Sequence, residues 1–395
     1  MEIYADNAAT TKICPAALSE MTRVSAEVYG NPSSPHTAGQ NAARTLWDAR
    51  ERVARLIGAS PREITFTSCG TEADNQAILS AVNADKTKKH IVSTRIEHHA
   101  VLRPLEALAR NGYEITPVGV GRDGTVDPAD VARAIRPDTA LVSVMFANNE
   151  IGTVQNIAEI GERCREAGVL FHTDAVQAVG HLPIDVGAMN VDFLTASAHK
   201  FHGPRGAGFL YARSGTALSS LLLGGGQERG RRAGTENLPA IAGMAAALEQ
   251  SCAHMTENAE RMTALRDRII DGILSSVPHS ILNGARDCRL PNNVSVAVED
   301  AGAEAMILLL DGMGIAVSSG AACAAGAGEP SHVLQSVGLP PELVRCVLRI
   351  TPGEELTEPQ ADRIIASVAA AAARLRELSP GWNAKIRGEQ PFIIQ

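Results

Sequence analysis

The chain has 395 residues, of which 45% are hydrophobic, 20% charged and 3% aromatic, and its formal net charge is −8. A chain of this length divides into two or three domains with large apolar cores. The acidic balance argues against a protein that coats nucleic acid, and the scarcity of aromatic side chains argues against base recognition by stacking. No run of about 18 apolar residues is present that could span a membrane.

The cysteines are scattered and form no Cys-x-x-Cys pair, so neither a zinc ribbon nor an iron–sulfur ligand set is predicted, and we expect no metal site. The seven residues are Cys14, Cys69, Cys164, Cys252, Cys288, Cys323 and Cys346. The first residues lack the basic and apolar regions of a secretory signal. We therefore expect a cytoplasmic protein with reduced thiols, one of which takes part in chemistry.

Short apolar runs alternate with helical patterns between about residues 60 and 212. The predicted strands are 64–67, 90–94, 140–146, 169–172, 192–195 and 206–211. Amphipathic segments such as 131–135 and 157–164 lie between several of them. This alternation predicts an α/β domain with a mostly parallel sheet that helices cover on both faces. Ligands of such sheets bind beyond the carboxyl ends of the strands. Polar residues follow the predicted strands there: Thr71, His98, Asn149, Asp174 and Lys200.

The rest of the chain predicts a smaller α+β domain. A helical stretch at about 236–278 is followed by two predicted strands and two predicted helices, at 293–298, 347–351, 303–312 and 357–377. We expect a large domain of residues 14–255. Residues 1–13 and 256–395 then form the smaller domain.

Lys200 is the most informative residue of the sequence. It ends an apolar stretch, is flanked by hydroxyl and imidazole groups and precedes a glycine-rich turn. Asp174 ends another apolar stretch about 25 residues upstream. A lysine that forms a Schiff base and an aspartate that holds the pyridinium nitrogen are the protein side of pyridoxal phosphate chemistry. Together the two residues predict this cofactor, although a lysine after a strand is by itself usually a surface residue.

The segment 67–72 follows a strand and opens a helix. Free N–H groups at a helix N-terminus bind phosphate, Gly70 lets the backbone approach closely, and Thr71 adds a hydroxyl donor. The alternative is a simple helix cap. His98 could stack on a cofactor ring and move protons. His98 and Asn149, taken singly, are equally typical of polar loop residues.

Two glycine-rich segments stand out later in the chain. Residues 224–235 fail the P-loop pattern because Arg231 and Arg232 follow Gly230, yet the loop can still present donors to a phosphate. The alternative is a solvated surface loop. Cys323 lies among small residues that leave a thiol accessible to substrate, although free cysteines are more often buried structural residues.

These motifs jointly resemble those of the pyridoxal-phosphate-dependent cysteine desulfurases, specifically the NifS/IscS group. The resemblance runs from Tyr4 to about Pro380, and segments 228–237 and 329–332 are most similar to the nitrogen-fixation NifS branch. It implies a type I aminotransferase-like α/β fold, a homodimer, and L-cysteine as substrate. It departs from the family at Ala324-Ala325 and after Arg349, where the chain reads Ile-Thr-Pro.

The resemblance assigns roles around the cofactor ring. It implies that Lys200 forms the Schiff base, Asp174 holds the pyridinium nitrogen, Gln177 contacts the ring hydroxyl, and His98 stacks on the ring and moves protons. It further implies a set of phosphate ligands, Gly70, Thr71, Ser197 and His199, joined by Thr235 from a second subunit.

The resemblance also implies how substrate is handled. Asn149, which also borders the cofactor, and Arg349 orient the substrate carboxylate; a surface strand arginine is the simpler interpretation of Arg349. Cys323 takes the substrate sulfur as a persulfide and passes it to a sulfur acceptor or iron–sulfur scaffold protein. A selenocysteine lyase or another β-eliminating lyase of the same fold is the alternative enzyme. A non-catalytic scaffold is the alternative outside enzymes, and it predicts loss of Lys200, Asp174 or Cys323, all of which are present.

Overall fold

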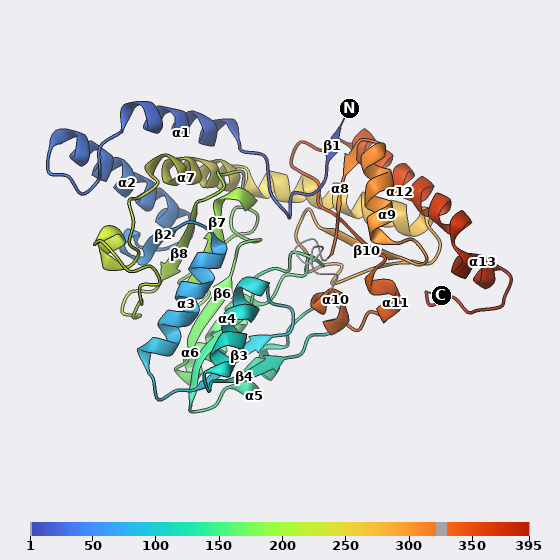
Figure 1. Cartoon of the computed structure of the whole chain (residues 1–395), viewed down its shortest axis with the longest axis horizontal. Helices are drawn as coiled ribbons and strands as arrows, with labels where there is room; N and C mark the ends of the chain where they lie inside the picture. The colour runs from blue at the N-terminus through green and yellow to red at the C-terminus, as the bar shows by residue number, and fades with distance from the viewer. Residues whose placement is uncertain (1, 321–329, 395) are drawn as a thin grey trace.

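A seven-stranded sheet forms the centre of the larger part of the molecule (Figure 1). The computed structural model describes residues 2–320 and 330–394. The strand order is β2-β8-β7-β6-β5-β3-β4; β8 runs antiparallel to both of its neighbours, and the other pairings are parallel. The strands are β2 (Ile64–Thr67), β3 (His90–Thr94), β4 (Glu114–Val118), β5 (Thr139–Ser143), β6 (Leu170–Asp174), β7 (Phe193–Ser197) and β8 (Gly208–Ala212). The predicted mostly parallel α/β sheet is confirmed.

The edge strand β4 was not among the predicted strands. Its side chains are mostly exposed or half-buried, so the apolar pattern that marks the central strands is weak in it. Pro117 lies within it, and a proline is tolerated because β4 pairs on one side with β3. The buried strands β3, β5, β6 and β7 each contain two or three consecutive apolar residues, and these are the strands that the sequence reveals.

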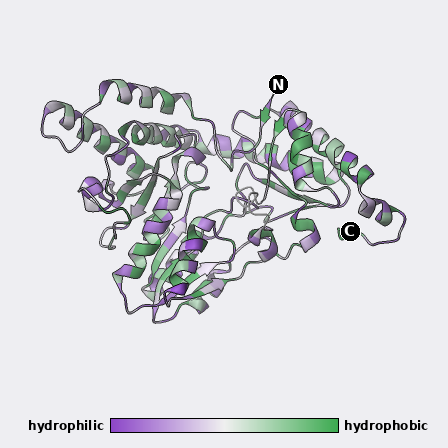
Figure 2. Cartoon of the chain, viewed as in Figure 1, coloured by the Kyte–Doolittle hydropathy of each residue, from purple (hydrophilic) through white to green (hydrophobic). Residues whose placement is uncertain are grey.

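Helices cover both faces of this sheet, as the sequence predicted. On one face α3 (Gly70–Ala84) and α4 (His99–Arg110) bury Ala77, Val101 and Leu105 against Leu141 and Phe193. The other face is covered by α2 (Thr37–Leu56), α5 (Pro128–Ala134), α6 (Ile157–Ala167) and α7 (Leu238–Ala253). Figure 2 shows hydrophobic residues along the strands and hydrophilic ones outside. This two-sided burial stabilises the sheet whose strand ends carry the site.

The predicted helical stretch 236–278 is two helices in the structure. α7 ends at Ala253 and α8 (Met255–Ser276) begins two residues later, after His254. α7 is buried nearly all round and packs on α1 (Pro15–Glu27), where a Cβ on Gly243 would come within 2.4 Å of Met21. α8 carries the chain away from the large sheet (Figure 1). The stretch 236–278 therefore contributes side chains to two apolar cores, one in each part of the molecule.

The smaller part of the molecule is built on a second sheet. Its order is β12-β13-β10-β9, and all of these pairs are antiparallel. The strands are β9 (Ser280–Leu282), β10 (Val294–Val298), β12 (Ser318–Ser319) and β13 (Val347–Ile350). β1 (Ile3–Tyr4) pairs in parallel with β11 (Ile315–Ala316), which brings the start of the chain to this part. α8, α9 (Ala303–Gly312) and α12 (Glu358–Leu378) supply the apolar side chains that cover the sheet.

The remaining helices are short. They are α10 (His332–Ser336), α11 (Pro341–Val344) and α13 (Pro380–Ile386). After α13 the tail returns to the small sheet, where Phe392 stacks on His279 with ring centroids 3.7 Å apart and the Glu299 carboxylate accepts the N–H groups of Ile393 and Ile394. None of the helices in the described part of the chain is long and apolar enough to cross a membrane.

Candidate active site

A cavity of about 360 Å³ lies at the carboxyl ends of β5, β6 and β7. The structure brings together in its walls all the predicted site residues except Thr235 and Cys323. These are Gly70, Thr71, His98, Asn149, Asp174, Gln177, Ser197, His199, Lys200 and Arg349. They come from six segments spread over 280 residues of sequence, and the segment at the end of β7 contributes three of them. The strand-end rule for parallel sheets therefore holds in this molecule.

Lys200 ends a short helical turn that follows β7. Its Nζ donates hydrogen bonds to the carbonyl oxygens of Ala8 and Ala9, at 2.5 and 2.8 Å. His181 Nε2 donates to the Lys200 carbonyl oxygen at 2.9 Å and fixes the backbone of the turn. The N-terminal segment therefore positions the lysine, a contact that its distance in sequence conceals.

Asp174 is the last residue of β6 and is buried. Its Oδ1 accepts the N–H of Val176 at 2.9 Å. Burial, together with the nearby Asp74, raises the pKa of Asp174 to about 6, and His98 opposes this rise. A cationic ring nitrogen beside this carboxylate would lower the pKa again, because an opposite charge favours the ionised form. The environment suits a carboxylate that pairs with a pyridinium.

His98 caps the N-terminus of α4. Its Nδ1 accepts the N–H of Ala100 at 3.1 Å, so the proton of the neutral ring sits on Nε2. Burial lowers the pKa of His98, Asp174 opposes this, and Lys200 adds to the lowering. The imidazole is therefore neutral near pH 7, in the state that can both accept and return a proton.

The first turn of α3 forms one end of the cavity. The first intrahelical bond of this helix runs from the Ala73 N–H to the Cys69 carbonyl, so the N–H groups of Gly70 and Thr71 have no helical partner. A Cβ on Gly70 would come within 2.6 Å of Val176 Cγ2, so a side chain there would fill this space. Ser197 lines the cavity together with this turn. The arrangement matches what a phosphate group requires.

His199 completes this end of the cavity. Its Nδ1 lies 3.2 Å from Thr10 Oγ1. Burial, together with Lys200 and Arg205, lowers the pKa of His199 to about 4. The ring is neutral and acts as a hydrogen-bonding group there. Gln177, also in this wall, donates from Nε2 to the Ala8 carbonyl at 3.0 Å.

Arg349 lies on β13 and reaches across from the small sheet. Its Nη2 donates to Asp6 Oδ1 at 2.9 Å and its Nη1 to the Asn149 carbonyl at 3.1 Å. Its buried Nε has no hydrogen-bond partner among the described residues. An unpaired donor on a buried guanidinium in a cavity wall is suited to receive a carboxylate. The interpretation of Arg349 as a surface residue is wrong, since its side chain is 3% exposed.

Two predicted residues remain, Thr235 and Cys323. Thr235 lines a different cavity of about 240 Å³ beside Ser68 and Arg232, so it does not reach the phosphate end in its own chain. Cys323 lies outside the described residues. The residues on either side of that segment, Gly320 and Pro330, line a cavity of about 380 Å³ that shares His98 and Asn149 with the site.

Sequence reasoning missed several cavity residues. Ala8 and Ala9 contribute backbone carbonyls, which no residue pattern announces. Asp6 was not among the predicted site residues, and it forms an ion pair with Arg349. Asp74 also lines the cavity, one helical turn after Gly70. Its position four residues beyond the helix start was the available signal, because residues four apart share a helix face.

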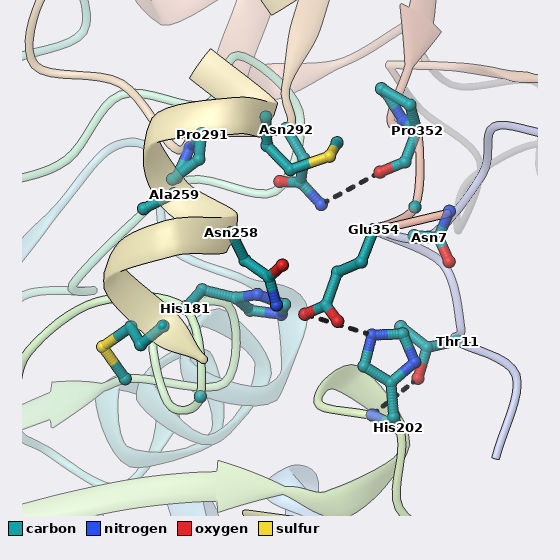
Figure 3. Close-up of a pocket in the computed structure, with 14 residues that line it drawn as sticks. Asn7, Thr11, His181, His202, Asn258, Ala259, Pro291, Asn292, Pro352 and Glu354 are labelled. Carbon is teal, nitrogen blue, oxygen red and sulfur yellow. Dashed lines mark hydrogen bonds and ion pairs between the residues drawn. The ribbon is translucent and has the colours of Figure 1, made fainter. Parts of the chain in front are cut away.

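A separate, much smaller cavity lies between α8 and the segment around Glu354 (Figure 3). Its volume is about 30 Å³, room for about one water-sized group. His202 Nε2 lies 3.8 Å from the Glu354 carboxylate, and the His202 N–H donates to Thr11 Oγ1 at 2.8 Å. This cavity is too small for a phosphorylated ring. The larger cavity with Lys200 is therefore the candidate active site.

The chain was compared with known proteins. The aminotransferase class-V family model matches residues 3–357. A protein of Clostridium botulinum named cysteine desulfurase IscS is 44% identical over 392 residues, 98% of this chain and 99% of the relative. A solved NifS-like protein superimposes with a TM-score of 0.89 at 35% identity, covering 95% of this chain and 100% of that one. A structure titled SspA in complex with cysteine has a TM-score of 0.78 at 33% identity, over 89% and 98% of the two chains.

The fold, the cavity and these similarities agree. Relatives of this length and identity align with every segment that contributes to the cavity. The lysine at the end of β7, the buried aspartate at the end of β6 and the open helix start match the three parts of the expected cofactor. The chain belongs to the aminotransferase class-V family, as a NifS/IscS-like enzyme that depends on pyridoxal 5'-phosphate and has the type I aminotransferase-like fold.

Proposed function

We propose that the protein is an L-cysteine desulfurase, which converts L-cysteine to L-alanine and leaves the sulfur as a persulfide on Cys323. The single observation that carries this is the convergence of Lys200, Asp174, His98 and Arg349 on one cavity. The relatives named cysteine desulfurase and the structure that contains cysteine point to the same reaction. They favour it over a selenocysteine lyase or another β-eliminating lyase.

The residues present suit the cofactor. Lys200 would carry it covalently, Asp174 would face the ring nitrogen, Gln177 the ring hydroxyl, and the start of α3 with Ser197 and His199 its phosphate. When bound, the cofactor supplies a protonated ring that withdraws electrons from the substrate and lowers the cost of removing the Cα proton.

Arg349 and Asn149 orient the substrate in this proposal. The free Nε of Arg349 and its neighbouring Nη groups pair with the substrate carboxylate, and Asp6 holds the guanidinium from the other side. Held in this way, the substrate amine and Cα point toward Lys200. Fixing the reacting atoms contributes to the rate because their relative freedom is removed before the reaction.

Two groups hold and move the proton. The Lys200 amine lies at the end of the short turn that follows β7 and would take the Cα proton of the substrate. The neutral His98 imidazole, with its proton on Nε2, exchanges protons with the sulfur group that leaves the substrate. The lowered pKa of His98 keeps it neutral for this task.

Sulfur transfer then requires a nucleophile. The Cys323 thiolate attacks the substrate sulfur, so that an S–S bond forms and the Cβ–S bond breaks. The electron pair of the broken bond stays with the substrate carbon, which is protonated to give alanine. The persulfide on Cys323 carries the sulfur to the acceptor, and no external oxidant or reductant is needed.

We further propose a homodimer. The consecutive exposed side chains Leu221, Leu222 and Leu223 leave an apolar surface directly before the glycine-rich loop, and Leu223 is 89% exposed. A second copy of the chain would cover this surface, since contiguous apolar groups are rarely left in water. Thr235, which lies outside the cavity of its own chain, would then reach the phosphate of the partner.

The cellular setting completes the proposal. The sulfur acceptor is an iron–sulfur scaffold protein, and the similarity to the NifS branch points to clusters used in nitrogen fixation. The described cysteines are all free thiols, which supports a reducing, cytoplasmic location without a membrane or nucleic-acid partner. The two apolar cores support domains of residues 14–255 and of 1–13 with 256–395.

The proposal is tested by incubating the holoenzyme with L-cysteine and measuring alanine, sulfide and protein-bound persulfide together. We expect alanine and persulfide in equal amounts in the first turnover, with the persulfide mapped to the peptide that contains Cys323. Cys323→Ser should retain cofactor and bind cysteine but form neither product. Cys288→Ser, which removes an exposed thiol elsewhere, is the control and should behave as wild type.

Sulfide release without persulfide would identify a β-eliminating lyase instead. Near-normal alanine formation by Cys323→Ser would remove that residue from the reaction.

A further inference from the structure

Asp74 is a buried carboxyl group in the wall of the cofactor cavity, and the proposed reaction gives it no role. It lies on α3 and is 1% exposed. A buried carboxyl group is costly unless it is paired or hydrogen-bonded, so its surroundings show what holds it there. The inference drawn here rests on the proposed function, because it concerns how the same cofactor is held.

Three polar side chains from neighbouring strands connect to Asp74. Thr195 Oγ1 donates to Asp74 Oδ1 at 2.6 Å, and His172 Nε2 lies 3.4 Å from the same oxygen. On its other side, His172 Nδ1 lies 2.8 Å from Ser143 Oγ. Ser143, His172 and Thr195 are all fully buried. The four residues form a polar chain in which His172 Nε2 has no hydrogen-bond partner among the described residues, so the hydrogen bond that reaches Asp74 comes from Thr195.

This polar chain of four residues lies next to Asp174. In the sheet, Asp174 is the register partner of Thr195, and Ser143 is the register partner of His172. His172 and Asp174 are two residues apart on β6, so their side chains leave the same face of the sheet. That face is the one covered by α3, which brings Asp74.

Two carboxyl groups so placed compete for one charge. Burial raises the pKa of Asp74 to about 7, and the Thr195 hydrogen bond opposes this. Burial also raises the pKa of Asp174 to about 6, and the nearby Asp74 contributes to that rise. Burial lowers the pKa of His172 to about 4, so no imidazolium is present to offset a charge on Asp74. The other titratable groups around the pair are Glu97, His98 and Lys200.

We propose that Asp74 is a positioning residue for the cofactor site. Its Oδ1 accepts the Thr195 hydroxyl and thereby fixes β7 against β6 at the level of Asp174, the carboxylate that would face the ring nitrogen of the cofactor. The oxygen of Asp74 is needed, and its charge is not.

The test separates the oxygen from the charge. Pyridoxal 5'-phosphate is titrated into the apoproteins of wild type, Asp74→Asn and Asp74→Ala, and affinity is read from absorbance. Asparagine keeps the acceptor oxygen and imitates the neutral acid, so its dissociation constant should stay within about threefold of wild type. Alanine leaves the buried Thr195 hydroxyl without its acceptor and should weaken binding by about tenfold or more.

A spectroscopic measurement excludes a purely structural role. In wild-type holoenzyme, the absorbance of the bound cofactor should change as pH rises from 6 to 9 and Asp74 loses its proton. Asp74→Asn should flatten this change, whereas Glu106→Gln, which alters an exposed carboxyl group outside the cofactor cavity, should retain it. Persistence of the wild-type pH dependence in Asp74→Asn would overturn the proposal.

Two further variants keep the test decisive. Thr195→Val removes the donor to Asp74 and should weaken cofactor binding in the same direction as alanine at 74, even if Asp74→Ala fails to fold. Ser80→Ala, a buried hydroxyl on the same helix outside the cavity, should leave affinity unchanged. Equal weakening of cofactor binding by Asp74→Asn and Asp74→Ala would mean that the charge of Asp74 is required, which would overturn the proposal. Wild-type affinity in both Asp74→Ala and Thr195→Val would mean that the Thr195–Asp74 hydrogen bond does not support cofactor binding, which would also overturn it. Failure of the desulfurase function would appear separately, as missing persulfide with cofactor affinity intact.

Discussion

Single side chains in the cavity are held by contacts from distant parts of the sequence. Lys200 Nζ is fixed by the carbonyls of Ala8 and Ala9, and Arg349 by Asp6 and Asn149. A flexible lysine or arginine loses about 2 kcal/mol of rotamer entropy when it is fixed. Fixing these side chains in the folded protein means that this cost is not borne during substrate binding, which is the usual benefit of a preorganised site.

Lys200→Ala should leave a folded protein that binds the cofactor without a covalent link. Turnover of cysteine should fall by a factor of about 10² to 10⁴, the usual range for the loss of a positioned proton-transfer group. Borohydride reduction followed by peptide mapping should label the Lys200 peptide in wild type and not in the variant. Arg205→Ala, an exposed neighbour, is the control. A variant that turns over cysteine at the parental rate would refute the assignment.

Glu97→Gln should change how stability depends on pH. Burial raises the pKa of Glu97 to about 8, well above the value of an unfolded chain, so the folded protein keeps a proton that the unfolded chain releases. Folding stability from this group is therefore full below about pH 4 and declines as pH rises toward 8. The variant should lose less unfolding free energy between pH 5 and 8 than wild type, by about 1–4 kcal/mol.

Denaturant unfolding of the apoprotein at both pH values measures this. Glu106→Gln, an exposed carboxyl group on α4, should leave the pH dependence unchanged. Parallel curves for wild type and Glu97→Gln would show that Glu97 is ionised in the folded protein.

The start of α3 is the element that the cofactor phosphate is expected to use. Its helix begins at Gly70 directly after β2, so the open N–H groups face the cavity and not another strand. The same helix carries Asp74 one turn later. A single helix therefore contributes to both the phosphate end and the ring end of the site, and its axial position affects both.

Gly70→Ala should weaken cofactor binding by about tenfold while leaving the fold intact. The added Cβ would lie 2.6 Å from Val176 Cγ2, and the clash is relieved by moving the helix start or Val176. The double variant Gly70→Ala, Val176→Ala should recover most of the affinity. Gly226→Ala, where a Cβ would meet nothing within 4 Å, is the control. Absorbance titration of the apoproteins measures each constant, and unchanged affinity in Gly70→Ala would argue against phosphate binding there.

The whole molecule places its site where the two parts meet. The large sheet supplies the strand ends, while Arg349 and the segment around Ser331 come from the smaller part. The N-terminal segment pairs with β11 of the smaller part through β1, and its Ala8 and Ala9 carbonyls accept hydrogen bonds from Lys200. Relative movement of the two parts would therefore alter both lysine and arginine together.

Leu223→Lys should weaken self-association and, with it, cofactor affinity. A charged group at this exposed apolar position would have to be buried against a second copy, at a cost of several kcal/mol. Leu308→Lys, on the exposed side of α9, is the matched control because its side chain is also largely exposed. Sedimentation equilibrium measures assembly, and absorbance titration measures the cofactor. A wild-type protein that is monomeric with full affinity would contradict the proposed homodimer and the role of Thr235.

The sequence by itself determined the strands that end at the site and the residues that follow them. β3, β5, β6 and β7 are buried on both faces, so each is an apolar run in the sequence that ends where the polar residues begin. Lys200 and Asp174 could be found for this reason. The large sheet, its helical covering and the cofactor follow from the same pattern.

Only the tertiary structure decided the contacts that join distant segments. Neither the pairing of Asp6 with Arg349, 343 residues apart, nor the use of Ala8 and Ala9 carbonyls leaves a periodic signal. The half-buried edge strand β4 has no continuous apolar run, and the polar chain at Asp74 is assembled from one helix and three strands. The local pattern of apolar residues reflects which side of a helix or strand is buried. Which distant segment packs against that side is determined by the packing of the whole chain.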